Sequence, residues 1–347
     1  MAIDSNSFSL SEWAMQSNDP VVNKITYSLY KTTSVLKDIP FTMSDVFKVT
    51  GVRWTNNLPT VSWGRLNQAP VATKGKPSTY EETFAIIRNI LPIDNKFLKN
   101  PHAIESPIKT QIDAYMERVA YELNDVFINN DPVSPGGNPD AWVGLRARCS
   151  TAGQTEFGTN SEMLINGGGL DLTVTTMTAL IANQLLELFQ RALDYMGAPD
   201  GEGVTAYMND DMKRRLEFAL RTMGTGTGFD VTKDNYDRSV EMYKQCKIRD
   251  IGRKAPTSAD PNQTSRVITS TENSTGTATT GSTYSSIYFV HYGDGQFKGW
   301  MNEALTVKPL GLDPTNGVMH NFVVDWGAGL HQAHTRSICR IYGLKMS

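Results

Sequence analysis

The strongest pattern in the chain is a stripe of apolar residues that recur at spacings of three and four between residues 106 and 129. Such spacing places the residues on one face of an α-helix. Ser106 is a good N-cap, and Pro107 suits the first helical position, where its missing N–H costs nothing. At about 1.5 Å per residue, this predicted helix is roughly 33 Å long. The stripe consists of Ile108, Ile112, Tyr115, Met116, Val119, Leu123, Val126 and Phe127.

Other helices are predicted on both sides of this one. Ser9-Leu10-Ser11-Glu12 has the form of a capping box, and Asn18-Asp19-Pro20 interrupts the apolar pattern that follows it. We therefore expect a short N-terminal helix, a break and a second helix over 20–37. Further on, the pattern predicts a helix over 174–196 ended by Gly197, a strand over 204–208, and a helix over 211–223 capped by Asn209 or Asp210. This alternation indicates a mixed α+β chain.

Strands dominate the C-terminal third of the sequence. Ser286–Tyr292 and Gln296–Trp300 flank Gly293-Asp294-Gly295, which predicts a β-hairpin. Residues 269–286 are mostly Ser, Thr and Gly, a composition typical of a flexible loop, to which no role is assigned. The remaining predicted strands are 247–251, 322–326 and 337–342, with Val267-Ile268 as a further candidate.

Residues 49–91 predict two long strands joined by the turn-rich stretch 67–77. No acidic residue lies between Asp45 and Glu81, although five basic residues do. Such a ribbon is either a solvated hairpin or an arm that lies on another molecule. A two-stranded ribbon is only marginally stable in water, and tryptophans on it favour burial at an interface. Composition alone leaves these two interpretations open.

Composition and charge exclude several classes of protein. The 347 residues are 39% hydrophobic and carry a net charge of −3, from 33 basic and 36 acidic residues. This argues against wholesale disorder and against a dedicated, strongly basic DNA-binding module. No apolar run is long enough for a transmembrane span, and the N-terminus does not have the pattern of a secretory signal. The length suggests about two domains, and three widely spaced cysteines indicate neither a disulfide framework nor a zinc site.

Motifs that could carry catalysis are weak. The glycine-rich run 224–228 follows a predicted helix instead of preceding one, so a phosphate-binding loop is disfavoured. His331 and His334 lack an acidic partner downstream and are expected to be structural. The adjacent pairs Glu81-Glu82 and Asp210-Asp211 do not suit acid–base chemistry across a cleft. We therefore predict no catalytic, cofactor-binding or metal site and expect that the protein is not an enzyme.

Four stretches carry a resemblance to a known family. They are residues 9–14 (SLSEWA), 57–68 (NLPTVSWGRLNQ), 286–293 (SIYFVHYG) and 337–344 (SICRIYGL). These stretches and the order of the predicted elements resemble the major capsid proteins of tailed bacteriophages, which have the HK-ninety-seven-like shell fold. The stretch 286–293 resembles a hairpin late in the axial domain of that fold. The resemblance extends over essentially the whole chain, and its strength lies in the order of the elements.

The resemblance implies a domain plan. Residues 1–49 would be an N-terminal arm, and residues 50–91 an extension loop built as a β-ribbon. Residues 92–170 and 321–347 would form a peripheral domain with 106–129 as its spine helix. Residues 171–320 would form an α/β axial domain.

The resemblance also implies a function. The chain would be a structural subunit that assembles with itself as pentamers and hexamers into an icosahedral shell around double-stranded phage DNA. Its partners would be neighbouring capsomers through the extension loop, a scaffolding protein and portal during assembly, and the packaged DNA through non-specific contacts. Assembly would take place in the host cytoplasm, and the protein would reside in the virion.

Six residues of the extension loop are hypothesised to make intersubunit contacts: Trp54, Trp63, Arg65, Leu66, Lys74 and Lys76. Two alternatives remain. One is an encapsulin-like shell around a protein cargo, and the other is a soluble two-domain enzyme with an unrecognised site.

Overall fold

The computed structural model describes residues 33, 35–53, 59–69, 73–75, 78–98, 107–150, 163–174, 176–224, 229–233, 239–277, 279, 281–303, 306–315 and 317–346. The predicted helix near residue 9 and most of the one over 20–37 lie outside these residues. So do Trp54 and Lys76 of the proposed contact set. Among the helices that are described, none is both long and apolar enough to cross a membrane.

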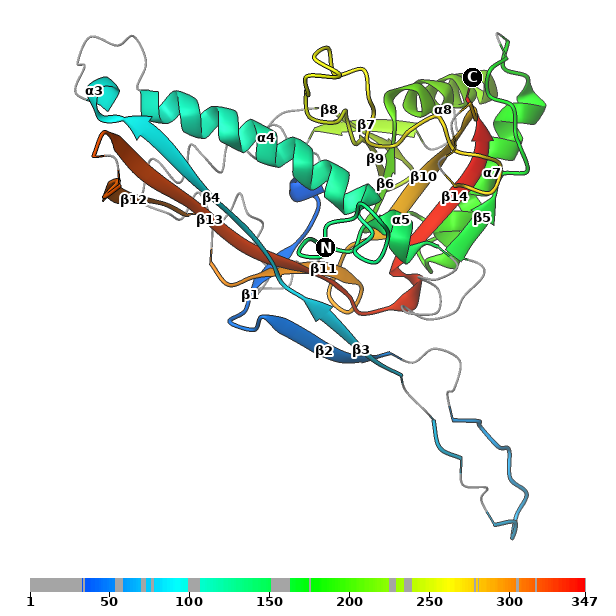
Figure 1. The fold of residues 1–347 in the computed structure, drawn as a ribbon. Helices are drawn as coiled ribbons and strands as arrows, with labels where there is room; N and C mark the ends of the chain where they lie inside the picture. The colour runs from blue at the N-terminus through cyan, green and yellow to red at the C-terminus, as the bar shows by residue number, and fades with distance from the viewer. Residues whose placement is uncertain are drawn as a thin grey trace.

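One half of the molecule is built on a seven-stranded sheet (Figure 1). Its strands, in spatial order, are β5 (Leu164–Asn166), β14 (Ile338–Lys345), β10 (Tyr284–His291), β6 (Val204–Met208), β9 (Cys246–Asp250), β8 (Ser239–Tyr243) and β7 (Phe229–Lys233). Helices α7 (Ala179–Tyr195) and α8 (Asp210–Met223) pack against each other, and α7 also contacts β14. All five side chains of β6 are buried, as expected for a central strand covered on both faces.

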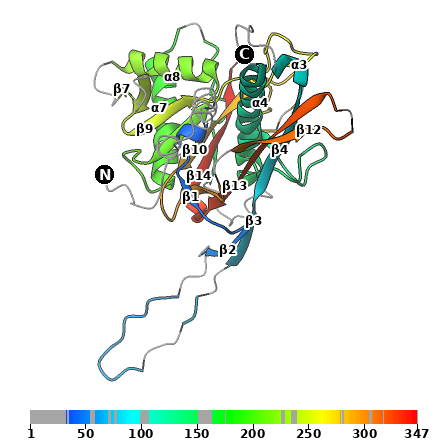
Figure 2. The same cartoon turned by 90° about the vertical axis from the view of Figure 1, so that its left-hand side faces the viewer.

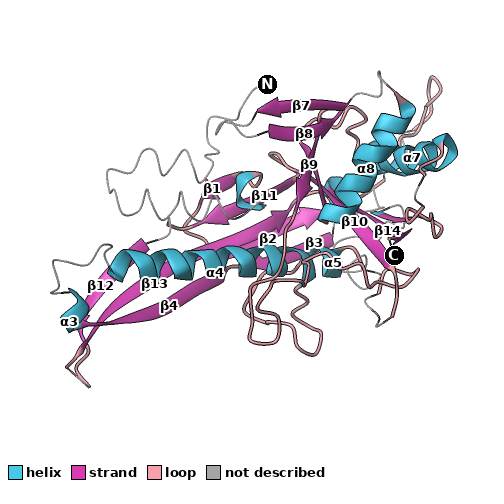
Figure 3. Ribbon diagram, turned by 90° about the horizontal axis from the view of Figure 1, so that it is seen from above, coloured by secondary structure: helices cyan, strands magenta, loops and turns pink. Residues whose placement is uncertain are grey.

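The other half is an elongated five-stranded sheet. Its strands are β1 (Phe41–Met43), β11 (Phe297–Met301), β13 (Met319–Gln332) and β12 (Thr306–Leu312) in that order, with β4 (Ala85–Asp94) along the second edge of β13. Helix α4 (Pro107–Asn129) runs beside β4 and β13 for most of their length (Figures 1 and 3). Phe127 near its C-terminal end contacts both Tyr207 of β6 and Phe297 of β11, so the two halves share one core.

A two-stranded ribbon continues from the end of β4. Strands β2 (Lys48–Arg53) and β3 (Ser78–Thr83) pair in antiparallel register, and only Phe84 separates β3 from β4. The ribbon and the loop beyond it extend away from both sheets (Figures 1 and 2). The predicted pairing is therefore confirmed, but each strand has six residues, and 59–69 and 73–75 are loop instead of strand. The short helical segments are η1 (Val35–Lys37), α3 (Asn95–Leu98), α5 (Leu145–Arg148) and η3 (Thr335–Ser337).

The long helices and most of the late strands match the sequence predictions. The apolar stripe forms α4 over Pro107–Asn129, and the 211–223 prediction becomes α8. Asn209 is the N-cap of α8, because its side chain accepts the Met212 N–H at 2.8 Å. Helix α7 begins at Ala179, five residues later than predicted, after a Thr178 cap. The strand predicted over 322–326 extends to the 14 residues of β13.

The predicted hairpin over 286–300 is wrong. Strand β10 belongs to the seven-stranded sheet and is flanked by β14 and β6, whereas β11 belongs to the other sheet and is flanked by β1 and β13. Both edges of each strand are occupied, so the two cannot pair with each other. The glycine turn instead carries the chain from one sheet to the other, with a single bridge between Tyr292 and Phe297.

The Ser/Thr-rich segment also differs from its prediction. Glu272 within it is fully buried, and its backbone pairs with Tyr284 in both directions. Val267 and Ile268 are buried, but they do not form a strand. The described part of this segment is thus fixed to the core through a charged side chain.

Candidate assembly surface

The loop at the far end of the ribbon exposes large apolar side chains to solvent. Trp63 and Leu66 are each 95% exposed. A local turn shapes this part of the loop: the Gln68 N–H donates to the Arg65 carbonyl at 3.0 Å, and the Arg65 N–H donates to Gln68 Oε1 at 3.2 Å. Exposed aromatic and aliphatic side chains at the end of a projecting ribbon mark a binding surface.

Four residues of the predicted contact set lie in the described part of this loop. Trp63, Arg65, Leu66 and Lys74 are all exposed there. Across the loop, the Thr73 hydroxyl donates to the Thr60 carbonyl at 3.0 Å, which holds its two sides together. The structure therefore brings these four residues to one projecting element, as the sequence predicts, and their intersubunit contact stays a prediction.

The base of the ribbon is fixed by a buried ion pair. Glu82 of β3 accepts two hydrogen bonds from the Arg148 guanidinium, at 2.8 and 3.3 Å. The Glu82 side chain is 4% exposed and that of Arg148 is 2% exposed. Glu82 also accepts the Gln332 N–H, at the end of β13, at 2.9 Å. Bidentate pairing in a buried setting fixes geometry as well as charge, so it sets the direction in which β3 leaves the body.

Arg148 also makes contacts with the backbone and with an aromatic ring. It ends the short helix α5, and its Nε donates to the Val143 carbonyl at 3.1 Å. Its guanidinium also lies 5.7 Å from the centre of the Phe297 ring. Sequence reasoning missed this pair. Strand alternation does place Glu81 and Glu82 on opposite faces, which marks one of them as inward, but nothing local points to an arginine 66 residues away.

The two C-terminal histidines make structural contacts, as expected. The His331 ring stacks on Tyr80 at 5.6 Å between centres, and its Nε2 hydrogen-bonds the Tyr80 hydroxyl. His334 caps η3 by accepting the Arg336 N–H at 3.1 Å. Burial lowers the pKa of His334, because it disfavours the charged imidazolium. His331 thus supports the ribbon base from a second strand.

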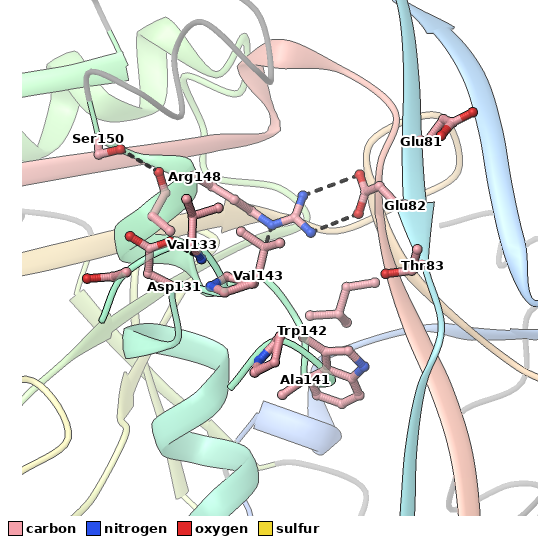
Figure 4. Close-up of a pocket in the computed structure, with 15 residues that line it drawn as sticks. Glu81, Glu82, Thr83, Asp131, Val133, Ala141, Trp142, Val143, Arg148 and Ser150 are labelled. Carbon is pink, nitrogen blue, oxygen red and sulfur yellow. Dashed lines mark hydrogen bonds and ion pairs between the residues drawn. The ribbon is translucent and has the colours of Figure 1, made fainter. Parts of the chain in front are cut away.

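A cavity of about 550 Å³ opens beside the buried pair (Figure 4). We call it the ribbon-base cavity. One wall is the β3 segment Glu81–Thr83, and the opposite wall is formed by residues 131–134 and 141–150. Arg148 points across it toward Glu82, and Val133 stands at its rim, 90% exposed.

A second buried charge cluster lies on the other side of α5. Glu272 accepts hydrogen bonds from Arg146 of α5, from Arg340 of β14 at 3.1 Å, and from the Ser286 hydroxyl. Each guanidinium satisfies part of the carboxylate, so the Glu272 charge is compensated in the core. No local pattern in the sequence points to this cluster.

A third buried carboxylate anchors the start of the described chain. Asp38 accepts hydrogen bonds from Arg249 and Tyr207 at 3.2 and 3.3 Å.

The cysteines are buried and unpaired. Cys149, Cys246 and Cys339 are all free, and burial raises the pKa of the Cys149 thiol to about 12. A protonated, inaccessible thiol does not act as a nucleophile.

A second exposed apolar surface lies on the five-stranded sheet. Ile86 and Ile90 alternate with the helix-facing residues of β4, and they point away from α4 together with the Arg88–Asp325 ion pair of 2.8 Å. We call this surface the outer sheet face.

The sequence matches one family model. Residues 17–181 match the family described as Major capsid protein GP7. This match covers the ribbon, α4 and most of the residues that line the ribbon-base cavity. No curated protein is similar enough in sequence to match the chain.

Solved structures share the fold at low sequence identity. The encapsulin of Synechococcus elongatus PCC 7942 is 10% identical, with a TM-score of 0.56 over 92% of this chain and 90% of that one. A chain of Microbacterium phage Oxtober96 is 13% identical, with a TM-score of 0.53 over 89% and 90%. A chain of Mycobacterium phage Bobi is 12% identical, with a TM-score of 0.53 over 91% of each. The predicted α+β shell fold is confirmed, and the family match favours the phage branch over the encapsulin branch.

Proposed function

We propose that this chain is a structural subunit whose pentamers and hexamers form an icosahedral shell around double-stranded phage DNA, a role supported by the match of residues 17–181 to a major capsid protein family and by the shared shell fold. The observation that carries the proposal is the projecting ribbon, whose loop exposes Trp63 and Leu66 almost completely. A monomer gains nothing from such a loop, whereas an assembly buries it.

The domain plan is part of the proposal. Residues 1–49 act as an N-terminal arm and 50–91 as the extension loop. Residues 92–170 and 321–347 form the peripheral domain, in which α4 is the spine. Residues 171–320 form the axial domain, whose loops meet at the five- and six-fold centres. In support, the seven-stranded sheet carries α7 and α8, while α4 accompanies the elongated sheet. The strands cross these bounds, since β5 and β14 belong to the seven-stranded sheet and β11 and β12 to the elongated one.

The extension loop supplies binding energy between neighbours. Burying one tryptophan removes about 200 Å² from water, worth roughly 5 kcal/mol at about 25 cal/mol per Å². Association costs offset part of this energy for each contact, but every subunit repeats the contact around the shell. The net charge of −3 adds little long-range repulsion between copies.

The remaining partners follow from the same role. A scaffolding protein and a portal take part in assembly in the host cytoplasm, and packaged DNA makes non-specific contacts through lysines and arginines on the inner face of the shell. The subunit contributes no catalytic step. An encapsulin-like shell is the second candidate, because the encapsulin of Synechococcus elongatus shares the fold. Nucleic acid in purified particles supports the phage role, and a protein cargo supports the encapsulin role.

Replacement of Trp63 tests the assembly role of the loop. We expect Trp63→Ala to raise the subunit concentration needed for particle formation, measured by sedimentation and negative-stain microscopy, while the Tm of isolated subunits stays unchanged. Trp63→Phe keeps an aromatic ring and should retain most assembly. Normal assembly of Trp63→Ala, or an equal loss of subunit Tm, would contradict the proposal.

A further inference from the structure

We propose that the ribbon-base cavity is the seat for the extension loop of a second copy of this chain, with Trp63 of that copy inserted between β3 and residues 131–150. This inference rests on the proposed function and adds the place where the loop binds. It commits to one occupant and one cavity.

The cavity has the size and lining for a large side chain. Its volume of about 550 Å³ lies within the roughly 300–1,000 Å³ typical of ligand pockets. Apolar groups of Ala141, Trp142, Val143 and Ala147 line it, next to the polar atoms of the buried pair (Figure 4). An indole placed there gains apolar contact and has polar acceptors within reach, a setting that suits tryptophan.

The loop of the same chain cannot fill this cavity. The cavity lies where β3 joins the body, and the described loop residues 59–69 lie beyond the far end of β2 and β3 (Figures 1 and 2). The ribbon is held in that direction by the Glu82–Arg148 pair. Trp63 therefore reaches this cavity only from a neighbouring subunit.

Charge favours binding of the extension loop in the ribbon-base cavity. Glu82, Asp131 and Arg148 bring charged groups to the cavity, and the guanidinium of Arg148 is already paired with Glu82. The Glu81 carboxylate points to the opposite face of β3, where it pairs with Lys48, so Asp131 supplies the further negative charge at the wall. The loop carries Arg65 two residues from Trp63, and no acid lies between Asp45 and Glu81. A basic loop thus meets a wall that carries the Asp131 carboxylate.

The outer sheet face is the competing seat, and its charges are balanced. Lys308 of β12 pairs with Val323 in register, on the same side as Ile90. Arg88 adds a second cation, whose charge is matched by Asp325. Asp325 raises the pKa of Arg88, and Glu303 also lies close enough to raise it. An incoming Arg65 would therefore meet balanced charges there, and the ribbon-base cavity with Asp131 is the better partner.

Cross-linking within particles tests the seat. We would combine Ser62→Cys, beside Trp63, with Val133→Cys at the cavity rim, and treat assembled particles with a short bismaleimide. The matched control joins Ser62→Cys to Ile90→Cys on the outer sheet face; both partner positions are exposed. The native cysteines are buried, so they should not react.

We expect cross-linked subunit dimers and higher multimers on denaturing gels for Ser62→Cys/Val133→Cys. The control variant should give at least fivefold less cross-linked product. Particles without cross-links, equal cross-linking of both variants, or preference for the control would overturn the seat while leaving the shell function intact. A wild-type chain that forms no particles with scaffold would overturn the shell function itself.

A second variant keeps the test independent of engineered cysteines. Ala147→Leu fills part of the cavity without changing charge. We expect it to raise the concentration needed for assembly at least tenfold while leaving the subunit Tm within about 2 °C of wild type, a shift of roughly 1–2 kcal/mol for a chain of this length. Unchanged assembly of the Ala147→Leu variant would overturn the proposal.

Discussion

Removing the guanidinium that holds the ribbon base should cost several kcal/mol. In Arg148→Gln, the Glu82 carboxylate loses bonds of 2.8 and 3.3 Å and keeps the Gln332 N–H at 2.9 Å. Its charge stays buried and loses the guanidinium of this ion pair. Breaking a buried pair by removing one partner costs about 3–5 kcal/mol, because the other charge is left uncompensated.

The expected change in Tm follows from the size of the chain. At about 2.1 cal/mol/K per residue, unfolding of 347 residues has an entropy of about 0.7 kcal/mol/K near Tm. A loss of about 3–5 kcal/mol therefore lowers Tm by about 4–7 °C. The assay is thermal unfolding of isolated subunits followed by circular dichroism, with urea unfolding as a second measurement.

Arg88→Gln is the matched control. It makes the same chemical change in an ion pair of 2.8 Å, but the Arg88 side chain is mostly exposed. Exposed pairs contribute little to stability because water screens them, so Tm should fall by about 1 °C or less. A double variant, Glu82→Met with Arg148→Met, should recover much of the stability, since neither charge is then left alone. If the two Arg→Gln variants lower Tm equally, the ion pair does not fix the ribbon base.

Three further predictions concern other parts of the molecule. Asn209→Ala removes the α8 cap and a buried amide that donates to the Ile268 carbonyl, and should lower the free energy of unfolding in urea by about 1–3 kcal/mol. Thr178→Ala removes the longer 3.4 Å cap of α7 and should lower it by less than about 1 kcal/mol. Gly329→Ala places a Cβ against the Trp300 ring and should lower the free energy of unfolding by about 1–3 kcal/mol, and adding Trp300→Leu should restore part of that stability. No loss of stability in the single variant would show that the ring moves freely. Because burial lowers the pKa of His334 below 6.5, the unfolded chain binds more protons than the folded chain just below that pH, so stability should fall as pH drops through about 6.5. His334→Asn keeps the cap acceptor and should make the curve of Tm against pH flatter, and an unchanged slope would contradict this.

Sequence reasoning found what is encoded locally. The stripe of α4, the Asn209 cap and the late strands depend on neighbours a few residues apart, and they match the structure. The exposed Trp63 was found as a candidate because tryptophans on a ribbon are poorly explained by a monomer.

Features that depend on distant partners were missed. The glycine turn at 293–295 predicts a hairpin, yet the sheet that each flanking strand joins is decided by β6, β14, β1 and β13. Likewise, Glu82 meets an arginine 66 residues away, and Glu272 meets one 126 residues away. No periodicity links such residues, so only the folded chain brings them together.

The four residues of α5 act as a mechanical coupling between the two halves of the subunit. Arg148 holds the ribbon base at Glu82, and two positions earlier Arg146 holds Glu272, which also binds Arg340 in the seven-stranded sheet. Glu82 in turn is bonded to the last residue of β13. A force that a neighbouring subunit applies to the ribbon is therefore transmitted through α5 to both sheets. When pressure acts outward on a shell, the strain in each subunit is then distributed over its whole core and is not concentrated at the ribbon.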